Sequence, residues 1–341
     1  KIIYLFVFVL ILLFFGSIYA MIFKNHCGYF ANGNVFITEG EICKNLKDYL
    51  VGNLSRHDRV SSFFGDELVL GSYVSRFLPF IIGLIYFHYS KINNSKILIY
   101  FVILLSLILI IISGERAALI YFIFFGFIFF IIVNERLINK IYLILSLTVI
   151  LIVSYFSFDQ VNKRMHQTYN QIEISINKKI LFSTDHHSHA VAAYKIFLDN
   201  KFLGTGPNTF REVCKNKKYF LNYIGTELNK NNNDLISGCS THPHNLYLQL
   251  LAETGIIGIL IPVVLQFLLI ILIIKKIIYL YKNDYNNNKK NNNLRCEILL
   301  LSSFFISVFP FIPSGNFFHN WLNFIYFYPL GFYLYVKKYA N

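Results

Sequence analysis

One histidine of the chain stands where a helix is expected to begin, in a position suited to proton transfer. The segment Thr241-His242-Pro243-His244-Asn245 precedes a long apolar run. Pro243 favours an extended His242, so His244 and Asn245 should fall near the first helical turn. The positive end of the helix would lower the pKa of His244 and favour the neutral imidazole. His244 is therefore a candidate general base and Asn245 a candidate substrate contact; alternatively, His244 only caps the helix or lies at a membrane interface.

A second group of histidines, His186, His187 and His189, begins another short helix. One of residues 183–185 should cap it, and the apolar run at 190–200 continues it. His186 and His189 are candidates for substrate contact; the alternative is an exposed polar helix start. The face expected to pack inward holds Ala190, Ala193, Tyr194 and Phe197.

A glycine-rich turn follows that helix. Gly204-Thr205-Gly206-Pro207-Asn208 has the glycine and proline content of a turn. Small residues of this kind can let backbone amides approach a phosphate, so Gly204 and Gly206 are candidate binding positions. The pattern by itself is weak evidence for a phosphate cradle.

The elements that carry these residues must lie in a membrane protein. The chain has 341 residues, of which 55% are hydrophobic and only 14% are charged, and its mean hydropathy is +0.52. Soluble domains carry about 25% charged residues, so one water-soluble core cannot hold this apolar mass. The sequence predicts an all-α polytopic helix bundle, a single domain over residues 1–341. Because Lys1 leads directly into an apolar stretch, we expect the natural chain to start earlier, with further helices.

Eight stretches approach or exceed the length needed to span a bilayer, about 20 residues. They are about 2–23, 74–89, 97–113, 117–133, 141–157, 246–274, 295–312 and 317–336. Each must be helical, because unsatisfied backbone groups in lipid cost several kcal/mol apiece.

The charges of the short connections predict the orientation. Lys and Arg gather in 90–96, 134–140 and 275–295 and in the C-terminal tail, whereas 114–116 and 313–316 hold only Arg116. The basic connections fall on one side of the bilayer, which the positive-inside rule makes cytoplasmic. The protein is therefore expected to cross its membrane several times, with these basic connections in the cytoplasm.

Two long loops, about 24–73 and 158–245, then face the periplasm. The Asn- and Lys-rich tract 283–293 is expected to be a solvated cytoplasmic linker. The net charge of +13 implies contact with anionic membrane lipids, and no nucleic-acid motif appears.

Four of the five cysteines lie in the outer loops. Each outer loop holds two cysteines, and the outer side of the membrane is oxidising, which suggests the disulfides Cys27–Cys43 and Cys214–Cys239. The alternative is that these are free or buried thiols. Cys296 lies at the inner end of a span. No Cys/His spacing resembles a zinc site, so no metal is expected.

Four motifs together resemble the O-antigen ligase and polymerase superfamily. The run HNLYLQLLAETGIIG, from His244 to Gly258, is similar to the family signature, and GTGPNTF to its other recurrent element. Ser113–Ala117 resembles a helix-end step with arginine, and Arg59–Gly71 an earlier outer-loop motif. The resemblance covers about residues 59–260. The family often has an arginine shortly before the outer amphipathic helix, where this chain has histidines.

The resemblance implies transfer of a glycan from an undecaprenyl-diphosphate carrier at the periplasmic face. The acceptor would be a sugar hydroxyl of lipid A-core for a ligase, or of a growing glycan for a polymerase, and no metal, nucleotide or other cofactor would be used. Arginine forks suit a diphosphate leaving group, and the candidates are Arg116, Arg211 and then Arg59. His244 would be the base. Glu253 is expected to anchor its helix or an arginine rather than to act in catalysis.

Bland alternatives remain for these arginines and for the function class. Arg116 could pair with Glu115 or extend to headgroups, and Arg59 could form a surface ion pair with Asp58. The rival class is a transporter or flippase of a lipid-linked glycan, which would place charged groups near the bilayer midplane. A membrane scaffold would not explain the ordered motifs, and the sequence does not separate ligase from polymerase.

Overall fold

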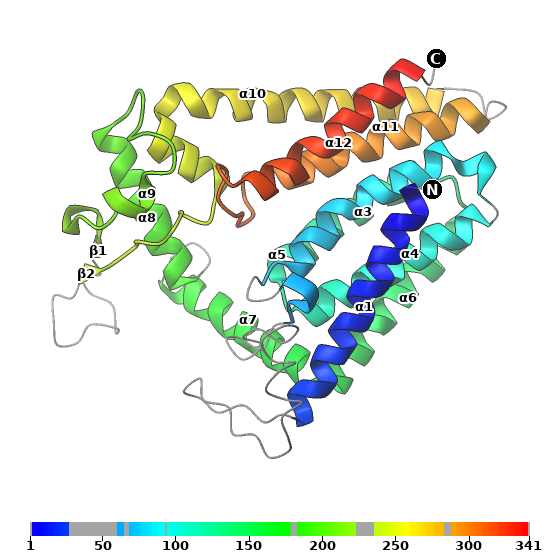
Figure 1. The fold of residues 1–341 in the computed structure, drawn as a ribbon, viewed down its shortest axis with the longest axis horizontal. Coiled ribbons are helices and arrows are strands. Elements are labelled where there is room, and N and C mark those ends of the chain that lie inside the picture. Colours follow the sequence, from blue (N-terminus) through cyan, green and yellow to red (C-terminus); the bar gives the residue numbers. More distant parts are fainter. Residues whose placement is uncertain are drawn as a thin grey trace. The chain divides into compact units, whose positions relative to one another are not determined.

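The structure, a computed structural model, describes residues 2–26, 60–64, 68–92, 94–178, 183–222, 235–282 and 288–339. These residues are mostly helical (Figure 1), which confirms the predicted all-α fold class. The chain divides into two compact units. Unit 1 comprises 1–165, 275–306 and 329–341, and unit 2 comprises 166–274 and 307–328. Three helices are divided between the two units: α7 (Asp159–Lys178), α10 (Leu246–Lys282) and α12 (Asn320–Tyr339); a fourth, α11 (Asn288–Ser307), contributes only its last residue to unit 2.

Unit 1 is built around α3. Its helices are α1 (Ile2–His26), α3 (Leu70–Phe87), α4 (Ser95–Ser113), α5 (Arg116–Ile132) and α6 (Leu137–Ser157), with all but the last residue of α11 (Asn288–Ser307) and the short turns η1 (Ser62–Phe64) and η2 (Tyr89–Lys91). α3 packs against α4 and α5. Leu78, Phe80, Ile82 and Ile85 of α3 are fully buried, so α3 is the apolar centre of this unit.

Five helices of the described part are long and apolar enough to cross a membrane: Ile2–Tyr19 within α1, then α3, α4, α6 and α10. α5 is a shorter apolar helix of 17 residues, and α11 and α12 are not among the five. Helices occupy all eight predicted spans. On α6 the only buried residue is Ser154, so the large apolar side chains of this helix are free to contact lipid.

One predicted boundary was wrong. The tract 283–293 was expected to be a linker, but α11 already begins at Asn288. Asn291 and Asn293 are buried, each with 7% of its surface exposed. Tertiary packing therefore overrides the low helix propensity of asparagine here. Lys276 of α10 and Glu297 of α11 form an ion pair within unit 1.

Unit 2 holds most of the predicted second outer loop, 158–245. Its elements are α8 (Thr184–Asp199), the one-turn α9 (Phe210–Val213), η3 (Lys217–Tyr219) and the two-residue strands β1 (Leu221–Asn222) and β2 (Leu235–Ile236). The strands pair antiparallel, with Leu221 opposite Ile236. α10 is kinked at Gly255, where φ is 64°. The first predicted loop, 24–73, lies mostly outside the described residues.

Candidate active site

α8 is capped and packed so that its histidines lie at its first turns. The side chain of Ser183 accepts a hydrogen bond from the backbone amide of His186 at 3.4 Å, as the sequence predicted for a residue of 183–185. The predicted buried face was partly wrong. Tyr194 is 51% exposed, and the buried residues are Ser188, Ala192, Ala193 and Ile196. The helix is rotated relative to the expectation because small side chains pack closest to its neighbours.

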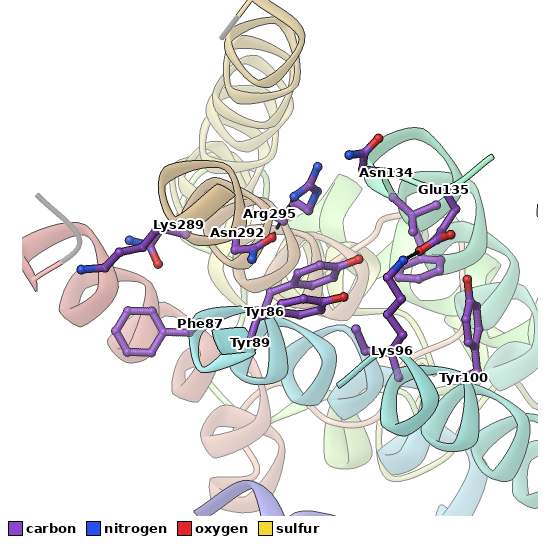
Figure 2. A pocket seen from close by; sticks show the side chains of 14 residues that line it. Tyr86, Phe87, Tyr89, Lys96, Tyr100, Asn134, Glu135, Lys289, Asn292 and Arg295 are labelled. Atoms are coloured by element: carbon purple, nitrogen blue, oxygen red, sulfur yellow. Dashed lines mark hydrogen bonds and ion pairs between the residues drawn. The ribbon is translucent and has the colours of Figure 1, made fainter. Parts of the chain in front are cut away.

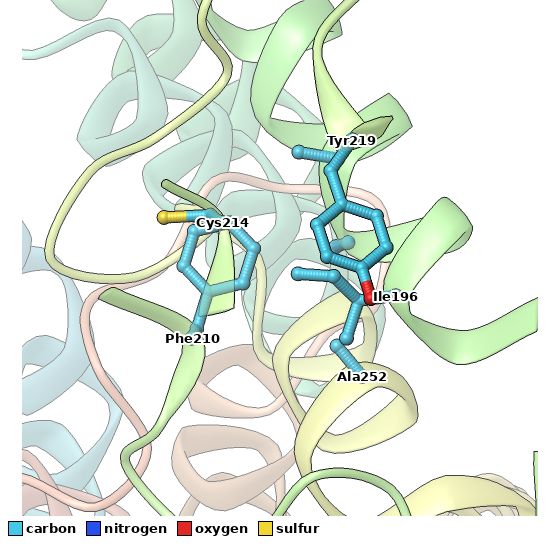
Figure 3. Packing of buried hydrophobic residues seen from close by; sticks show 7 residues of the cluster. Ile196, Phe210, Cys214, Tyr219 and Ala252 are labelled. Carbon is cyan, nitrogen blue, oxygen red and sulfur yellow. The ribbon is translucent and has the colours of Figure 1, made fainter. Parts of the chain in front are cut away.

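A small apolar cluster joins α8, α9 and α10 within unit 2 (Figure 3). It contains Ala192, Ala193, Ile196, Phe210, Cys214, Tyr219 and Ala252. Cys214 is bonded to Cys239, with Cα atoms 5.1 Å apart, which confirms this predicted disulfide. Cys296 is buried and free, and Cys27 and Cys43 lie outside the described residues. The cluster and the disulfide fix the 235–240 segment beside α8.

Asn245 begins α10. Its Oδ1 accepts the amides of Tyr247 and Leu248 at 3.0 and 3.1 Å, and its Nδ2 donates to the carbonyl of Pro310 at 2.7 Å. His244 just before it has a φ of 53°, the left-handed region that few residues other than glycine adopt. The amide of Ser314 donates to the His244 carbonyl at 2.9 Å. The 308–318 loop therefore holds the strained backbone of His244 in place.

Four imidazoles meet in front of α10, and they are called the imidazole cluster below. The His244 ring centroid lies 5.6 Å from that of His186, 5.3 Å from His189 and 4.3 Å from His242. Three of these were candidates from the sequence and come together as a group. His242 was missed, although two histidines separated by one residue in THPHN was the available signal.

Burial keeps His242 and His244 neutral. Burial first, and then the charges that His242, His189 and His186 carry when protonated, lower the pKa of His244 from 6.5 to about 3. Burial likewise lowers the pKa of His242 to about 4. The direction for His244 agrees with the sequence-based expectation, but the principal cause is desolvation rather than the helix end. A neutral imidazole has one nitrogen lone pair that can accept a proton.

The hydrogen bond of His189 defines which of its nitrogens is a base. Its Nδ1 lies 2.9 Å from the carbonyl oxygen of Gly238. A carbonyl only accepts, so Nδ1 carries the proton and Nε2 carries the lone pair of the neutral ring. Gly238 is required for this approach, because a Cβ there would clash with the carbonyl of Ser188.

The glycine turn docks on the kink of α10. The amides of Thr205 and Gly206 donate to the carbonyls of Ala252 and Glu253 at 3.1 and 2.9 Å. A Cβ at Gly204 would overlap the backbone of Glu253. Gly204 is therefore explained by close backbone contact and Gly206 by its positive φ of 105°. The Thr205 and Gly206 amides are already engaged by protein acceptors.

Glu253 anchors this turn, as the sequence suggested it would anchor its helix. Its carboxylate is 1% exposed and accepts the amides of Asn208 and Phe210 at 3.0 and 2.8 Å. Gln249, one helical turn earlier, donates to it at 3.1 Å and to Asn316 Oδ1 at 2.7 Å. This buried network connects α10 to the turn and to the loop that covers His244.

A second set of motif residues meets at one end of unit 1. The Glu115 carboxylate accepts the amides of Gly71 and Ser72 at 2.8 and 3.2 Å and the Ser72 hydroxyl at 2.6 Å. It thereby caps α3. Arg116 is half-buried in the first turn of α5. Of the predicted earlier motif, Arg59 lies outside the described residues.

Residues 101–263 match the family model described as O-antigen ligase. This match supports an O-antigen ligase-like family for the chain. No curated protein matches the chain. The matched segment contains Arg116, the glycine turn, the imidazole cluster and the α10 kink. Proteins with this domain are membrane enzymes that transfer glycans, so lipid-linked glycan and glycan acceptor substrates follow in general terms.

The matched segment also contains an arginine that the sequence analysis did not single out. Arg164 of α7 donates from Nε and Nη2 to the Gly114 carbonyl at 3.4 and 3.3 Å, at the same helix end as Arg116. The sequence did not indicate Arg164 because the family resemblance predicts an arginine immediately before α8, and Arg164 lies twenty residues earlier. Arg211, in contrast, lies exposed on α9.

α3, which precedes the matched residues 101–263, carries a buried cation inside a predicted span, where few charges were expected. Arg76 is 2% exposed. It donates to the Tyr121 hydroxyl at 2.9 Å and to the Ser72 carbonyl at 3.2 Å, and its guanidinium lies 4.5 Å from the Tyr121 ring centroid. These contacts bind α3 to α5, so Arg76 has a structural role inside unit 1.

Among the described residues, no group of three or more His, Cys, Asp or Glu side chains is arranged to hold a metal ion. The imidazole cluster is therefore considered as a set of proton acceptors and hydrogen-bond donors.

Proposed function

We propose that this protein transfers a glycan from a polyprenyl-diphosphate carrier to a sugar hydroxyl of lipid A-core. The reaction would take place at the periplasmic face of the bacterial inner membrane, without a metal or nucleotide. The observation that carries the proposal is the imidazole cluster at the start of α10, in which burial lowers the pKa of His244 and keeps that ring neutral, inside a segment matching the O-antigen ligase family.

His244 acts as the general base in this proposal. The acceptor hydroxyl oxygen attacks the anomeric carbon of the donor glycan and forms the new glycosidic bond. The bond from that carbon to the diphosphate oxygen breaks, and its electron pair leaves with the polyprenyl diphosphate. The hydroxyl proton goes to the free nitrogen of His244 and then to water.

The low pKa of His244 is compatible with this role once the donor is bound. An imidazole with a pKa of about 3 is a weak base. A negative charge about 5 Å away favours the imidazolium by about 3 kcal/mol at an effective dielectric constant of about 20, which is about two pKa units. The two charges of a diphosphate would raise the pKa of His244 close to neutral pH, where the imidazole is an effective base. Donor binding thus activates the base, and the free enzyme keeps it unprotonated.

Arginines would hold the charge that develops on the diphosphate. Arg116, Arg211 and Arg59 remain the candidates, and Arg164 joins them because it lies at the Arg116 end of unit 1. A guanidinium binds two phosphate oxygens at once and stays charged at every relevant pH. His186 and His189 are proposed to contact the substrate.

Three further candidates are proposed to act by position. Asn245 caps α10 and ties it to Pro310, which fixes the His244 backbone. Gly204 and Gly206 allow the turn to dock on α10. In this proposal these three residues affect substrate binding by fixing the position of His244 and of the glycine turn.

The test is complementation of a deletion strain with the full-length gene, followed by profiling of surface polysaccharide. His244→Ala and Arg116→Ala should abolish long-chain glycan at equal membrane level, whereas the exposed His166→Ala should restore it. The purified protein with a lipid-diphosphate-linked glycan, lipid A-core and a chelator should repeat this ranking. Full complementation by His244→Ala would leave His244 as a helix-start residue and favour the transporter class.

The accumulated product separates the alternatives that share the donor. Long unlinked polymer in the inactive strain indicates a ligase, and single-repeat product indicates a polymerase. Loss of transfer only when the chelator is present would contradict metal-independent chemistry.

A further inference from the structure

A pocket of about 560 Å³ lies in unit 1, at the helix ends away from Glu115. It is bounded by the C-terminal ends of α3 and α5, the N-terminal end of α4 and the first turns of α11 (Figure 2). α4 is 19 residues long, so the pocket is about 28 Å from the Gly114 end of that helix. The pocket is therefore separate from Arg116 and Arg164, which lie at the Gly114 end within unit 1.

Arg295 is the key side chain of this pocket. It lines the pocket, yet only 9% of the residue is exposed. Its Nε donates to the carbonyl of Ile132 at 2.9 Å and its Nη1 to Asn292 Oδ1 at 2.8 Å. Both acceptors are uncharged. Within the described ranges, no carboxylate forms an ion pair with Arg295 and no acceptor bonds its Nη2.

A nearly buried cation without a counter-charge is energetically costly. The two hydrogen bonds hold the guanidinium in one orientation, with Nη2 left to bind something else. The missing partner is an anion, and a phosphate is the anion that a guanidinium fork fits best.

The remaining charged groups of the pocket add up to a positive site. Among the described residues that line the pocket, Glu135 is the one acidic group, and it is paired with Lys96 at 2.7 Å. Hydrogen bonding from Lys96 and Asn139 keeps the pKa of Glu135 below its usual value despite the opposing effect of burial, so this pair is ionised and neutral as a whole. Arg295 and the exposed Lys289 carry the excess positive charge.

Aromatic rings form one wall and bring hydroxyl donors. The rings of Tyr86 and Tyr89 are stacked with centroids 5.8 Å apart, and the Arg295 guanidinium lies 5.8 Å from the Tyr86 ring centroid. Figure 2 shows the two tyrosine hydroxyls at the same end of the stack. Phe87 and Ile99 add apolar surface to the same pocket. The pocket lining thus combines hydrogen-bond donors that suit a phosphate with apolar surface that suits a hydrocarbon chain.

We propose that this pocket binds the phosphate group of an anionic phospholipid headgroup. Arg295 and Lys289 would neutralise the phosphate, and Tyr86 and Tyr89 would donate hydrogen bonds to it. The pocket lies at the helix ends where the basic connections 90–96 and 134–140 emerge, which is the cytoplasmic side by the positive-inside rule. Basic pockets between transmembrane helices on that side suit anionic headgroups. The proposal is independent of glycan transfer.

The test measures lipid binding by the full-length protein in detergent by native mass spectrometry. Dioleoyl phosphatidylglycerol is titrated against dioleoyl phosphatidylcholine, with wild type, Arg295→Gln, Lys289→Gln and the control Lys337→Gln. Lys337 is an exposed lysine of unit 1 on α12 that does not line the pocket. Arg295→Gln should weaken binding of phosphatidylglycerol at least tenfold and Lys289→Gln about threefold, because each removes one charge-assisted contact. Lys337→Gln should bind as wild type.

Each result decides the proposal. Equal affinity for the two lipids, or equal effects of Arg295→Gln and Lys337→Gln, would overturn it. If Arg295→Gln does not fold, Lys289→Gln against Lys337→Gln gives the same comparison. Displacement of phosphatidylglycerol by millimolar glycerol phosphate would overturn the lipid source and assign the site to a soluble phosphate ester.

Discussion

The Nδ1 atom of His189 lies 2.9 Å from the carbonyl oxygen of Gly238, and this contact depends on the absence of a side chain at residue 238. Gly238→Ala would drive a Cβ into the Ser188 carbonyl and separate the 235–240 segment from α8. We expect a stability loss of about 1–3 kcal/mol and reduced glycan transfer, measured by thermal unfolding in detergent and by transfer assay. Gly126→Ala is the matched control, because a Cβ there meets nothing within 4 Å. Equal unfolding temperatures for the two variants would contradict this role of Gly238.

The low pKa values of the imidazole cluster predict that acid destabilises the protein. The pKa values of His242 and His244 fall from 6.5 to about 4 and about 3 on folding. Between pH 6.5 and those values the unfolded chain binds protons that the folded chain does not. Their stability contribution is therefore fully present above about pH 6.5 and lost as the pH falls toward 4 and below. Because both rings are partly exposed, we expect about 1–3 kcal/mol between pH 7 and 5.

This pH effect is measured by thermal unfolding in detergent from pH 7.5 to 5. The double variant His242→Gln/His244→Gln should show a shallower decline than wild type. An unchanged slope would mean that the two imidazoles remain accessible to protons in the folded protein.

Kinetic pH profiles should separate the free enzyme from the donor complex. The His244 base must be unprotonated, so transfer is lost only as the pH falls through its pKa. For kcat/KM, which reports the free enzyme, the His244 pKa of about 3 predicts no loss from this group down to about pH 5. For kcat, the bound diphosphate raises the pKa, so the rate should fall nearer neutrality. Identical acid limbs for both parameters would argue against activation by the donor.

Glu253→Gln tests the network beneath the glycine turn. The carboxylate accepts two backbone amides in a buried site, and an amide side chain would point a donor at one of them. We expect a loss of about 2–3 kcal/mol in the free energy of unfolding. The control is Glu212→Gln, whose exposed carboxylate forms a surface ion pair with Lys215; it should leave the unfolding temperature unchanged. A mild effect of Glu253→Gln would show that the turn is held mainly by its backbone contacts with α10.

The Cys214–Cys239 disulfide should stabilise unit 2. It closes a sequence separation of 25 residues, for which chain entropy gives about 3 kcal/mol. Replacing both cysteines by serine should lower the unfolding temperature, and reductant should lower that of wild type but not of the double variant. Reductant sensitivity in the double variant would trace the effect to other cysteines.

Much of the candidate site was readable as local pattern. Ser183 was expected to cap α8 within the range 183–185, and the Cys214–Cys239 pair followed from cysteine count and side. Glu253 was correctly interpreted as an anchor, although its partners, the Asn208 and Phe210 amides, were not foreseen. Such features depend on residues close in the sequence or on which side of the membrane a segment lies, and both can be inferred from the amino-acid sequence.

The buried face of α8 and the start of α11 were misjudged because their outcome depends on distant partners. Ala192 and Ile196 face inward because α10 and α9 arrive there. Asn291 and Asn293 become helical because unit 1 buries them. Propensity and periodicity do not contain that information.

The sequence by itself determined that this is a membrane helix protein that resembles the O-antigen ligase family, since hydrophobic length, charge asymmetry and linear motifs are properties of the chain. Only the tertiary structure decided that His242 joins His186, His189 and His244, and that burial rather than the helix end lowers the His244 pKa most. Only it placed Arg295 in a pocket without a carboxylate partner among the described residues. The physical reason is common to all three: desolvation and pairing depend on which side chains are neighbours in space, and those neighbours are separated along the sequence.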